Sequence, residues 1–128
     1  MEKVQTALQF GSVTPIFLIF EEVKAREFYL NFLEFEVDWE HRVAPGMPLY
    51  FQVSKGNCRI HLSEHHGDAA PGASIRIETP SVEDYQQLLL SKPPLFARPA
   101  LEDQPWGSRE MTITDPFHNR LIFFQTIE

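Results

Sequence analysis

The sequence predicts an α+β fold built from two similar modules, each with the element order β-α-β-β-β. This order occurs once in about residues 13–63 and again in about residues 73–126 of the 128-residue chain. Hydrophobic residues make up 43% of the sequence, enough to bury one core, so we expect one domain spanning residues 1–128. A repeat period near half of the chain indicates two modules packed together, because a solenoid needs three or more repeats.

The first module begins with a short apolar strand and continues through one helix. Residues 13–20 (VTPIFLIF) are too short for a typical helix, and Pro15 favours the start or the edge of a strand. In residues 22–33, apolar residues recur at helical spacing and predict an amphipathic helix. In residues 35–40, apolar residues ending at Trp39 alternate strictly with acidic ones, which predicts a strand. Two further strands are expected at residues 49–54 and 58–63, joined by the hairpin loop Lys55-Gly56-Asn57.

The second module follows a linker rich in His, Gly and Pro at residues 65–72. Residues 73–78 predict a strand, and Ser81 is a candidate N-cap for a helix that ends near Ser91. The expected elements after this helix are a short strand at residues 95–98, a loop at residues 99–107, and strands at residues 109–114 and 120–126.

Alternation along the strands assigns two faces to the predicted sheets. The aliphatic face is expected to cover the helices, and the opposite face carries mostly polar side chains. The pattern is compatible both with plain exposure of the polar face to water and with a ligand-binding concavity. The aliphatic set is Ile60, Leu62, Ile75, Ile77, Met111, Ile113, Leu121 and Phe123, and the opposite set is Arg59, His61, Ser63, Ser74, Arg76, Glu78, Glu110, Thr112, Thr114, Arg120, Ile122 and Phe124.

Charge and cysteine content narrow the partners of the protein. The chain has 11 Lys and Arg against 18 Asp and Glu, a formal net charge of -7, which disfavours nucleic acid and anionic membranes as partners. Cys58 is the single cysteine, so neither an internal disulfide nor a Cys-based zinc motif can form, and a reducing cytoplasmic location is expected. No run approaches the roughly 18 apolar residues that a membrane span requires.

Three stretches of the sequence resemble a known superfamily: EEVKAREFYLNFLEF, HLSEHHGDAAPGA and above all EDQPWGSREMTITDPFHNRLIFF. They are similar to the glyoxalase / bleomycin resistance / extradiol dioxygenase superfamily, also called vicinal oxygen chelate proteins, and within it to the bleomycin-resistance-protein-like branch. With the element order, the resemblance implies a curled mixed sheet around a concavity, with the helices outside. Two glycines that are usual in the family are Glu34 and His118 here, and the residue at position 118 is expected to need a positive φ.

The resemblance also bears on metal binding, because metal-dependent members place four His, Gln or Glu ligands on strands that face the concavity. Carried over by motif, these positions fall at Thr14, His61, Ser74 and Ile122. Of these four, His61 alone is a competent ligand, since hydroxyl groups bind zinc, nickel or iron poorly at neutral pH and isoleucine offers no ligand atom. We therefore expect neither a catalytic metal nor another cofactor.

Without a metal, the resemblance implies binding rather than catalysis. The bleomycin-resistance branch sequesters a cationic, flat-tailed glycopeptide antibiotic in a groove between two subunits. The negative net charge and an aromatic fraction of 12% suit such a ligand, so we expect the protein to bind a cationic or aromatic small molecule. The resemblance also implies a homodimer, and it offers antibiotic resistance as one role among others. The expected ligand-binding residues are Trp39, Phe51, His61, Trp106, Glu110, Arg120 and Phe124, and none is assigned a catalytic role.

Two alternatives stay open at the level of the sequence. The first is an atypical enzyme of the superfamily, of the lyase or dioxygenase type, with His61 as a general base beside Glu110 on the same face. The second is a dimeric domain whose pocket is vestigial. For Phe51 and Phe124, packing in the core is as well supported as contact with a ligand.

Overall fold

The computed structural model describes residues 8–93 and 96–127, which form two mixed four-stranded sheets with helices packed against them. The strand order is β1-β4-β3-β2 in sheet A and β5-β8-β7-β6 in sheet B. In each sheet the first of these strands pairs parallel with its neighbour, and the other pairs are antiparallel. The predicted α+β fold with two βαβββ modules is confirmed. The strands are β1 Ile16–Leu18, β2 Glu36–His41, β3 Tyr50–Lys55, β4 Cys58–Ser63, β5 Ser74–Glu78, β6 Glu102–Gln104, β7 Ser108–Thr114 and β8 Arg120–Thr126, and the helices are α2 Glu22–Arg26, η1 Glu27–Phe32 and α3 Val82–Leu90.

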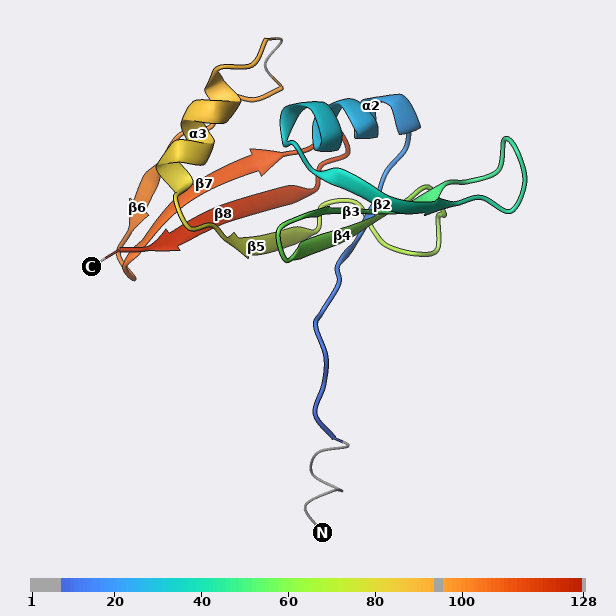
Figure 1. Ribbon diagram of the computed structural model, residues 1–128, viewed down its shortest axis with the longest axis horizontal. Coiled ribbons are helices and arrows are strands. Elements are labelled where there is room, and N and C mark those ends of the chain that lie inside the picture. The colour runs from blue at the N-terminus through green and yellow to red at the C-terminus, as the bar shows by residue number, and fades with distance from the viewer. Residues whose placement is uncertain (1–7, 94–95, 128) are drawn as a thin grey trace.

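The helices lie on one side of the two sheets and leave the other side open (Figure 1). We call the side without helices the open face. The predicted aliphatic residues lie under the helices, and those on the inner strands are fully buried. Ile75 and Ile77 pair with Leu121 and Phe123 and share their face, but they are only half-buried because β5 is an edge strand.

The helix predicted over residues 22–33 begins as the α-helix α2 and continues as the π-helix η1. The N–H of Leu33 donates to the carbonyl of Phe28 at 2.9 Å, a spacing of five residues that is typical of a π-helix. The chain then reverses into β2 at Glu34, where φ is 63°. A residue with a side chain is strained there, which explains why glycine is usual at this position in the family that the sequence resembles.

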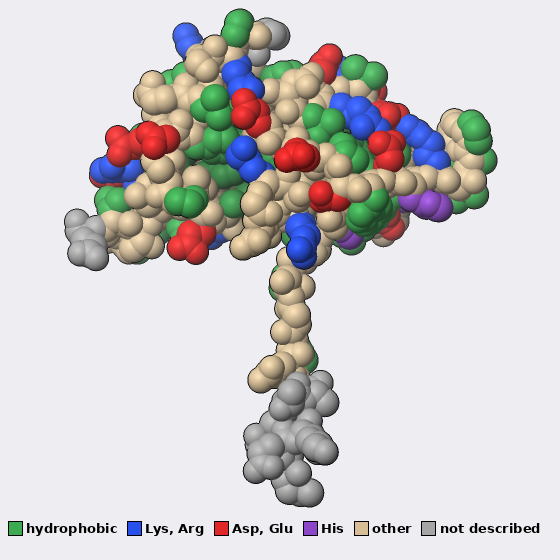
Figure 2. Space-filling model, in the orientation of Figure 1, with side chains coloured by type: hydrophobic (Ala, Val, Ile, Leu, Met, Phe, Trp, Pro, Cys, Tyr) green, Lys and Arg blue, Asp and Glu red, His purple; other side chains and the backbone are tan. Residues whose placement is uncertain are grey.

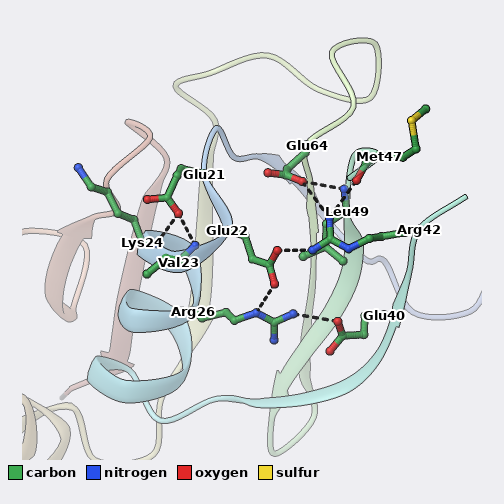
Figure 3. A network of polar contacts seen from close by, with 10 residues as sticks. All are labelled: Glu21, Glu22, Val23, Lys24, Arg26, Glu40, Arg42, Met47, Leu49 and Glu64. Atoms are coloured by element: carbon green, nitrogen blue, oxygen red, sulfur yellow. Dashed lines mark hydrogen bonds and ion pairs between the residues drawn. The ribbon is translucent and has the colours of Figure 1, made fainter. Parts of the chain in front are cut away.

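Ion pairs join the start of α2 to sheet A (Figure 3). The Arg26 guanidinium contacts Glu22 and Glu40, each at 2.8 Å, and so links the helix to β2. Arg42 also binds Glu22 and lies 3.9 Å from Glu64 at the end of β4. These contacts hold α2 over the side of sheet A that faces away from the open face.

The turn between β7 and β8 connects the two modules. Buried Asp115 accepts the Tyr29 hydroxyl at 2.7 Å and two backbone N–H groups of its own turn at 2.8 Å. The Asn119 amide in the same turn donates to the carbonyl of Leu18 at 3.0 Å. The turn requires a φ of 73° at His118, so the expected positive φ at this position is confirmed. The cost of that backbone conformation is offset by a buried polar connection between modules.

The predictions of a strand at residues 95–98 and of a loop throughout residues 99–107 are wrong. For the strand expected at residues 95–98, Leu95 lies outside the described residues and residues 96–98 form no strand, because Phe96 packs on the rings of Phe28 and Phe32 at 5.8 and 5.6 Å. The edge strand is instead β6, inside the segment expected to be a loop. At α3, the prediction that Ser81 is the N-cap residue is confirmed, although its side chain makes no capping bond. Gln125 accepts the N–H of Val82 instead, at 3.1 Å.

Residues 8–15 form an extended arm that leaves the protein on the open face (Figures 1 and 2). Phe10 and Val13 in this arm are 94% and 91% exposed. The arm meets sheet A at Pro15, whose carbonyl accepts the N–H of His61 at 2.9 Å. Among the described residues, no helix is long and apolar enough to cross a membrane.

Candidate functional site

A β-bulge places Trp39 on the open face of sheet A. Strict alternation would leave Trp39 on the same face as Phe35 and Val37, which pack against the core. The register between β2 and β3 shifts between Val37 and Trp39, so Asp38 is the extra residue and Trp39 pairs with Gln52 instead. Trp39 is consequently 43% exposed and lies over the polar side of the sheet.

His61 lies at the centre of a chain of hydrogen bonds on this face. Its Nδ1 is 2.7 Å from the Tyr50 hydroxyl, and its Nε2 is 2.9 Å from Oε1 of Gln52. The amide of Gln52 donates to the Asp38 carboxylate at 2.8 Å, which fixes Oε1 as the acceptor toward His61. The imidazole therefore carries its proton on Nε2 and accepts the Tyr50 hydroxyl at Nδ1.

The electrostatic environment supports this assignment. Partial burial lowers the pKa of His61 and favours the neutral imidazole. Burial, followed by the charge of Asp68, raises the pKa of Tyr50, so its hydroxyl keeps the proton that it donates. Hydrogen bonds from Gln52 and then Ser54 lower the pKa of Asp38, which stays an anionic acceptor. We call Asp38, Trp39, Tyr50, Gln52 and His61 the sheet-A cluster.

Aromatic packing completes the sheet-A cluster. The rings of Trp39 and Tyr50 are nearly parallel, with centroids 6.0 Å apart and an interplanar angle of 9°. The His61 ring meets both edge-on, at 5.2 Å from each centroid. The edge of the imidazole thus packs against both aromatic rings. Part of the Trp39 ring remains exposed and is accessible to a flat ligand.

A second group of side chains lies on the open face of sheet B. Glu110 on β7 is 8% exposed and accepts from Arg76 on β5 at 2.9 Å and from the Trp106 indole at 3.2 Å. Arg76 crosses β8 to reach Glu110, and its guanidinium lies 4.4 Å from the centroid of the Phe124 ring. The hydrogen bond from Arg76 is the main reason why the pKa of Glu110 is lowered. We call Arg76, Trp106, Glu110 and Phe124 the sheet-B cluster.

The remaining sequence candidates lie apart from these clusters. Arg120 is exposed on the open face of sheet B, where its Nε donates to the Ser74 hydroxyl at 3.0 Å. Phe51 is fully buried on the helix side of sheet A, with the Arg26 guanidinium 5.0 Å from its ring centroid. We therefore remove Phe51 from the site: its neighbours Tyr50 and Gln52 face the open side, so Phe51 faces the core.

Four residues of the clusters are absent from the candidates that the sequence suggested: Tyr50, Gln52, Arg76 and Asp38. Alternation in residues 49–54, the strand that became β3, places the first two on the open face and could have identified them. Arg76 was expected on this face, but its bridge to Glu110 depends on the register of three strands, which the sequence does not specify.

The family resemblance gives four positions for metal ligands. The residues at these positions do not form a site that could hold a metal ion. The registers pair Ile16 with His61, Ser74 with Arg120 and Arg76 with Ile122, so the three positions His61, Ser74 and Ile122 lie on the open face as expected. His61, however, uses Nδ1 to accept from Tyr50 and Nε2 to donate to Gln52, which leaves no lone pair for a cation. Within the described residues, no three His, Cys, Asp or Glu side chains are grouped as a metal site would require.

Two paired βαβββ modules, with helices on one side and polar clusters on the other, define the class of protein. It is an α+β protein of the vicinal-oxygen-chelate type. The family model of the glyoxalase superfamily proteins matches residues 2–128, so the chain belongs to this superfamily. No curated protein matches the sequence.

Solved structures share this fold at low sequence identity. A bleomycin-binding protein complexed with bleomycin has a TM-score of 0.69 and 18% identity, over 91% of this chain and 99% of the other. A bleomycin-binding protein from Streptomyces verticillus, complexed with copper(II)-bleomycin, has a TM-score of 0.67 and 23% identity, over 94% and 98%. A glyoxalase-related enzyme from Clostridium phytofermentans has a TM-score of 0.72 and 16% identity, over 93% and 97%. These similarities establish the fold.

Proposed function

We propose that the protein is a metal-independent binding protein that sequesters a cationic or aromatic small molecule. The observation that carries the proposal is the hydrogen bonding of His61, whose two ring nitrogens are both engaged while Trp39 beside it stays accessible. The negative net charge favours a cationic ligand, and Trp106, 66% exposed beside Glu110, offers a second stacking surface. Two of the structural neighbours are complexed with bleomycin or copper(II)-bleomycin, which makes these the first ligands to test.

The ligand site in this proposal lies between two copies of the chain. A binding pocket must be concave, but each cluster lies on one open sheet face. Two clefts, of about 950 and 640 Å³, lie where the sheets meet, and neither is lined by His61 or Trp106. A homodimer would bring the open face of a second copy over each cluster and form a groove. A monomeric mass in solution would contradict this part of the proposal.

An enzyme with His61 as the general base and Glu110 beside it has less support. Within the described chain His61 is bonded to Tyr50 and Gln52 on sheet A, and Glu110 is bonded to Arg76 and Trp106 on sheet B. Each candidate is already paired inside its own cluster. We therefore favour binding, and we place the protein in the cytoplasm because its single thiol, Cys58, suits a reducing compartment.

The test is a thermal-shift and calorimetric titration with metal-free bleomycin, copper(II)-bleomycin, and zinc or nickel ions alone. A ligand at 100 times its Kd should stabilise the protein by about 2.7 kcal/mol, whereas the metals alone should not. Trp39→Ala and Trp106→Ala should weaken binding, and Val23→Ala, an exposed change on the helix side, should not. Stoichiometric metal retained through His61 would reject the proposal. The absence of a thermal shift with both metal-free bleomycin and copper(II)-bleomycin would also reject it. If binding is found, antibiotic resistance is tested next, by the growth of cells that express the protein in medium containing bleomycin.

A further inference from the structure

The chain of hydrogen bonds in the sheet-A cluster has a direction, and it ends at the Tyr50 hydroxyl. The Gln52 amide donates to Asp38 at 2.8 Å, so the Gln52 oxygen is the atom that faces Nε2 of His61, at 2.9 Å. Nε2 therefore carries the imidazole proton, and Nδ1 is left as an acceptor. The Tyr50 hydroxyl, 2.7 Å from Nδ1, consequently donates its proton to His61. Asp38 thus sets the orientation of the Tyr50 hydroxyl through two intervening side chains.

This orientation decides what the Tyr50 hydroxyl can offer to a ligand. Its proton is taken by His61, so toward a ligand the same group is an acceptor only. Tyr50 is half-buried on the open face, and the Trp39 ring lies beside it with centroids 6.0 Å apart. A flat ligand in contact with the exposed part of Trp39 therefore has this acceptor as a neighbour.

The charges around the chain favour a cation at its Tyr50 end. Burial is the main reason why the pKa of Tyr50 is raised, and the charge of nearby Asp68 adds to it. At the other end, the hydrogen bond from Gln52 is the main reason why the pKa of Asp38 is lowered, and Arg59 contributes as a nearby cation. A positively charged ligand is thus attracted by Asp68 at Tyr50 and opposed by Arg59 at the other end.

We propose that the sheet-A cluster selects flat cations that carry N–H groups, such as protonated aminoheterocycles and amidines, over flat cations whose nitrogens are fully alkylated. The inference rests on the proposed function and specifies the chemistry of its ligand. The ligand N–H donates to the Tyr50 oxygen while the ligand ring contacts Trp39. Gln52 is a positioning residue, because it sets the tautomer of His61. An alkylated cation would cover the Tyr50 oxygen without giving it a donor, which costs free energy.

The direction of the chain supplies a preference that other features of the site do not. If the Gln52 amide turned over, the proton would move to Nδ1 of His61, and the Tyr50 hydroxyl would accept from the imidazole and donate to the ligand. The site would then prefer a ligand acceptor to a ligand N–H group. The aromatic surface of Trp39 and the net charge of -7 attract both kinds of cation alike. Selectivity between the two therefore reports the hydrogen-bonded chain.

Two pyridinium cations test the selectivity because they share one ring and one charge. The para-aminopyridinium ion carries N–H groups on both nitrogens, and the N-methyl-para-(dimethylamino)pyridinium ion carries none. NMR titration of the full-length protein is carried out well above pH 6.5, where the imidazole, whose pKa is lowered from that value, is neutral. The first ion should bind about 10-fold more tightly, as expected for one charge-assisted hydrogen bond. Uncharged pyridine is the third probe and reports ring contact alone.

Three variants locate the selectivity within the chain. Tyr50→Phe keeps the aromatic ring and removes the acceptor, so the two cations should bind with dissociation constants within about 2-fold of each other. Gln52→Leu leaves Tyr50 in place but no longer fixes the tautomer of His61, so the preference should also fall. Ser54→Ala is the matched control: it removes another donor to Asp38, at 3.0 Å, outside the chain to Tyr50, and should keep the wild-type preference.

Nitrogen-15 chemical shifts of the His61 ring test the direction of the chain without any ligand. In the wild type Nε2 should be protonated and Nδ1 unprotonated, and the signals are assigned by their loss in His61→Ala. In Gln52→Leu the form with the proton on Nδ1 should become populated. A wild-type protein with Nδ1 protonated overturns the inference, and so does a Gln52→Leu variant with unchanged shifts and unchanged selectivity.

The outcomes separate the selectivity from binding itself. If both cations bind the wild type equally, or the alkylated one binds more tightly, the selectivity is overturned and cation binding stands. A preference that persists in Tyr50→Phe also overturns it, because another group then accepts from the ligand. If neither cation binds while a bleomycin form does, this inference alone fails. If neither the pyridine probes nor a bleomycin form binds, the proposed function fails with it.

Discussion

The two clusters on the open face hold a tryptophan in place by different means. Trp39 in the sheet-A cluster lies over a neutral hydrogen-bonded chain, in which Tyr50 donates to His61 and His61 donates to Gln52. Trp106 in the sheet-B cluster donates to Glu110, whose carboxylate is paired with a guanidinium. The groups that touch the Trp39 ring are uncharged and are linked through Gln52 to the Asp38 carboxylate, whereas Trp106 is held directly by a carboxylate in an ion pair.

This difference means that the two halves of the site respond to different conditions. The ion pair depends on ionic strength and on the ionisation of a carboxylate, whereas the neutral chain depends on the protonation of an imidazole. Trp39 and Trp106 are the two tryptophans of the chain, so Trp106→Phe and Trp39→Phe each leave a fluorescent reporter in one cluster. The comparison can therefore be tested one cluster at a time.

The largest effect is expected from Glu110→Ala. This change removes the acceptor of Trp106 and the partner of Arg76, both charge-assisted contacts, so the free energy of unfolding should fall by about 1–2 kcal/mol. If the proposed binding of bleomycin holds, its affinity should fall at least 10-fold as Trp106 loses its orientation. Chemical denaturation and calorimetry measure the two effects. Glu102→Ala is the control, since exposed Glu102 pairs with Glu110 across β6 and β7; a similar loss there would contradict the assignment.

A smaller loss is expected from His61→Ala. It leaves the Tyr50 hydroxyl and the Gln52 carbonyl without a protein partner, but the position is half-buried and water can replace the ring, so the cost should be about 1 kcal/mol. The emission of Trp39 in a Trp106→Phe background should also shift, because the imidazole edge no longer meets the indole. His41→Ala, an exposed change on the same strand, serves as the control.

The pH dependence should separate the two clusters further. The pKa of His61 is lowered from 6.5 in the folded state, so the unfolded chain takes up the proton first and stability falls as the pH drops below about 6.5. The pKa of Glu110 is lowered from 4.5, so its contribution is present above about 4.5 and is lost as the pH falls through the folded-state pKa. Unfolding titrations of wild type, His61→Ala and Glu110→Gln measure these steps. If the loss of stability below pH 6.5 persists unchanged in His61→Ala, a group other than His61 causes it.

The smallest effects should come from the two strained positions outside the clusters. His118→Gly should raise the free energy of unfolding by about 0.5–1 kcal/mol, because glycine adopts a positive φ without strain. Glu34→Gly should raise the free energy of unfolding by less, because it also removes the ion pair between Glu34 and Lys92 at 2.5 Å. Thermal denaturation measures both, with fluorescence of Trp39 and Trp106 unchanged. A loss of stability in His118→Gly would contradict this prediction. It would show that contacts of the His118 side chain stabilise the fold by more than the positive φ destabilises it.

The fold was predictable because alternation along buried strands is a strong signal. Ile60, Leu62, Met111 and Ile113 lie under the helices as expected, since moving any of these strands by one residue would expose the whole set. The strand β6 escaped prediction because Glu102–Gln104 is a short edge strand with no apolar residue. Its pairing comes from backbone bonds to β7, which leave no pattern in the sequence.

The site was only partly predictable, for a different reason. His61 and Glu110 could be selected because alternation places them on the polar sheet face, and Trp106 could be selected as an aromatic residue in a loop. The bulge at Asp38 could not, because alternation assumes that no residue is inserted. Phe51 was selected by its aromatic character, although its alternation with Tyr50 and Gln52 places it in the core.

The bulge in β2 lets two consecutive side chains share one face of a strand. Regular alternation would place Asp38 and Trp39 on opposite sides of the sheet, whereas the extra residue brings both to the side of Gln52. Deletion of Asp38 would restore regular pairing with β3 and leave Trp39 beside Gln52, but it would remove the carboxylate that accepts from Gln52 and Ser54. A single inserted residue can thus add a charged group to a sheet face without moving the aromatic ring next to it, and comparisons of this fold based on substitutions alone would miss that change.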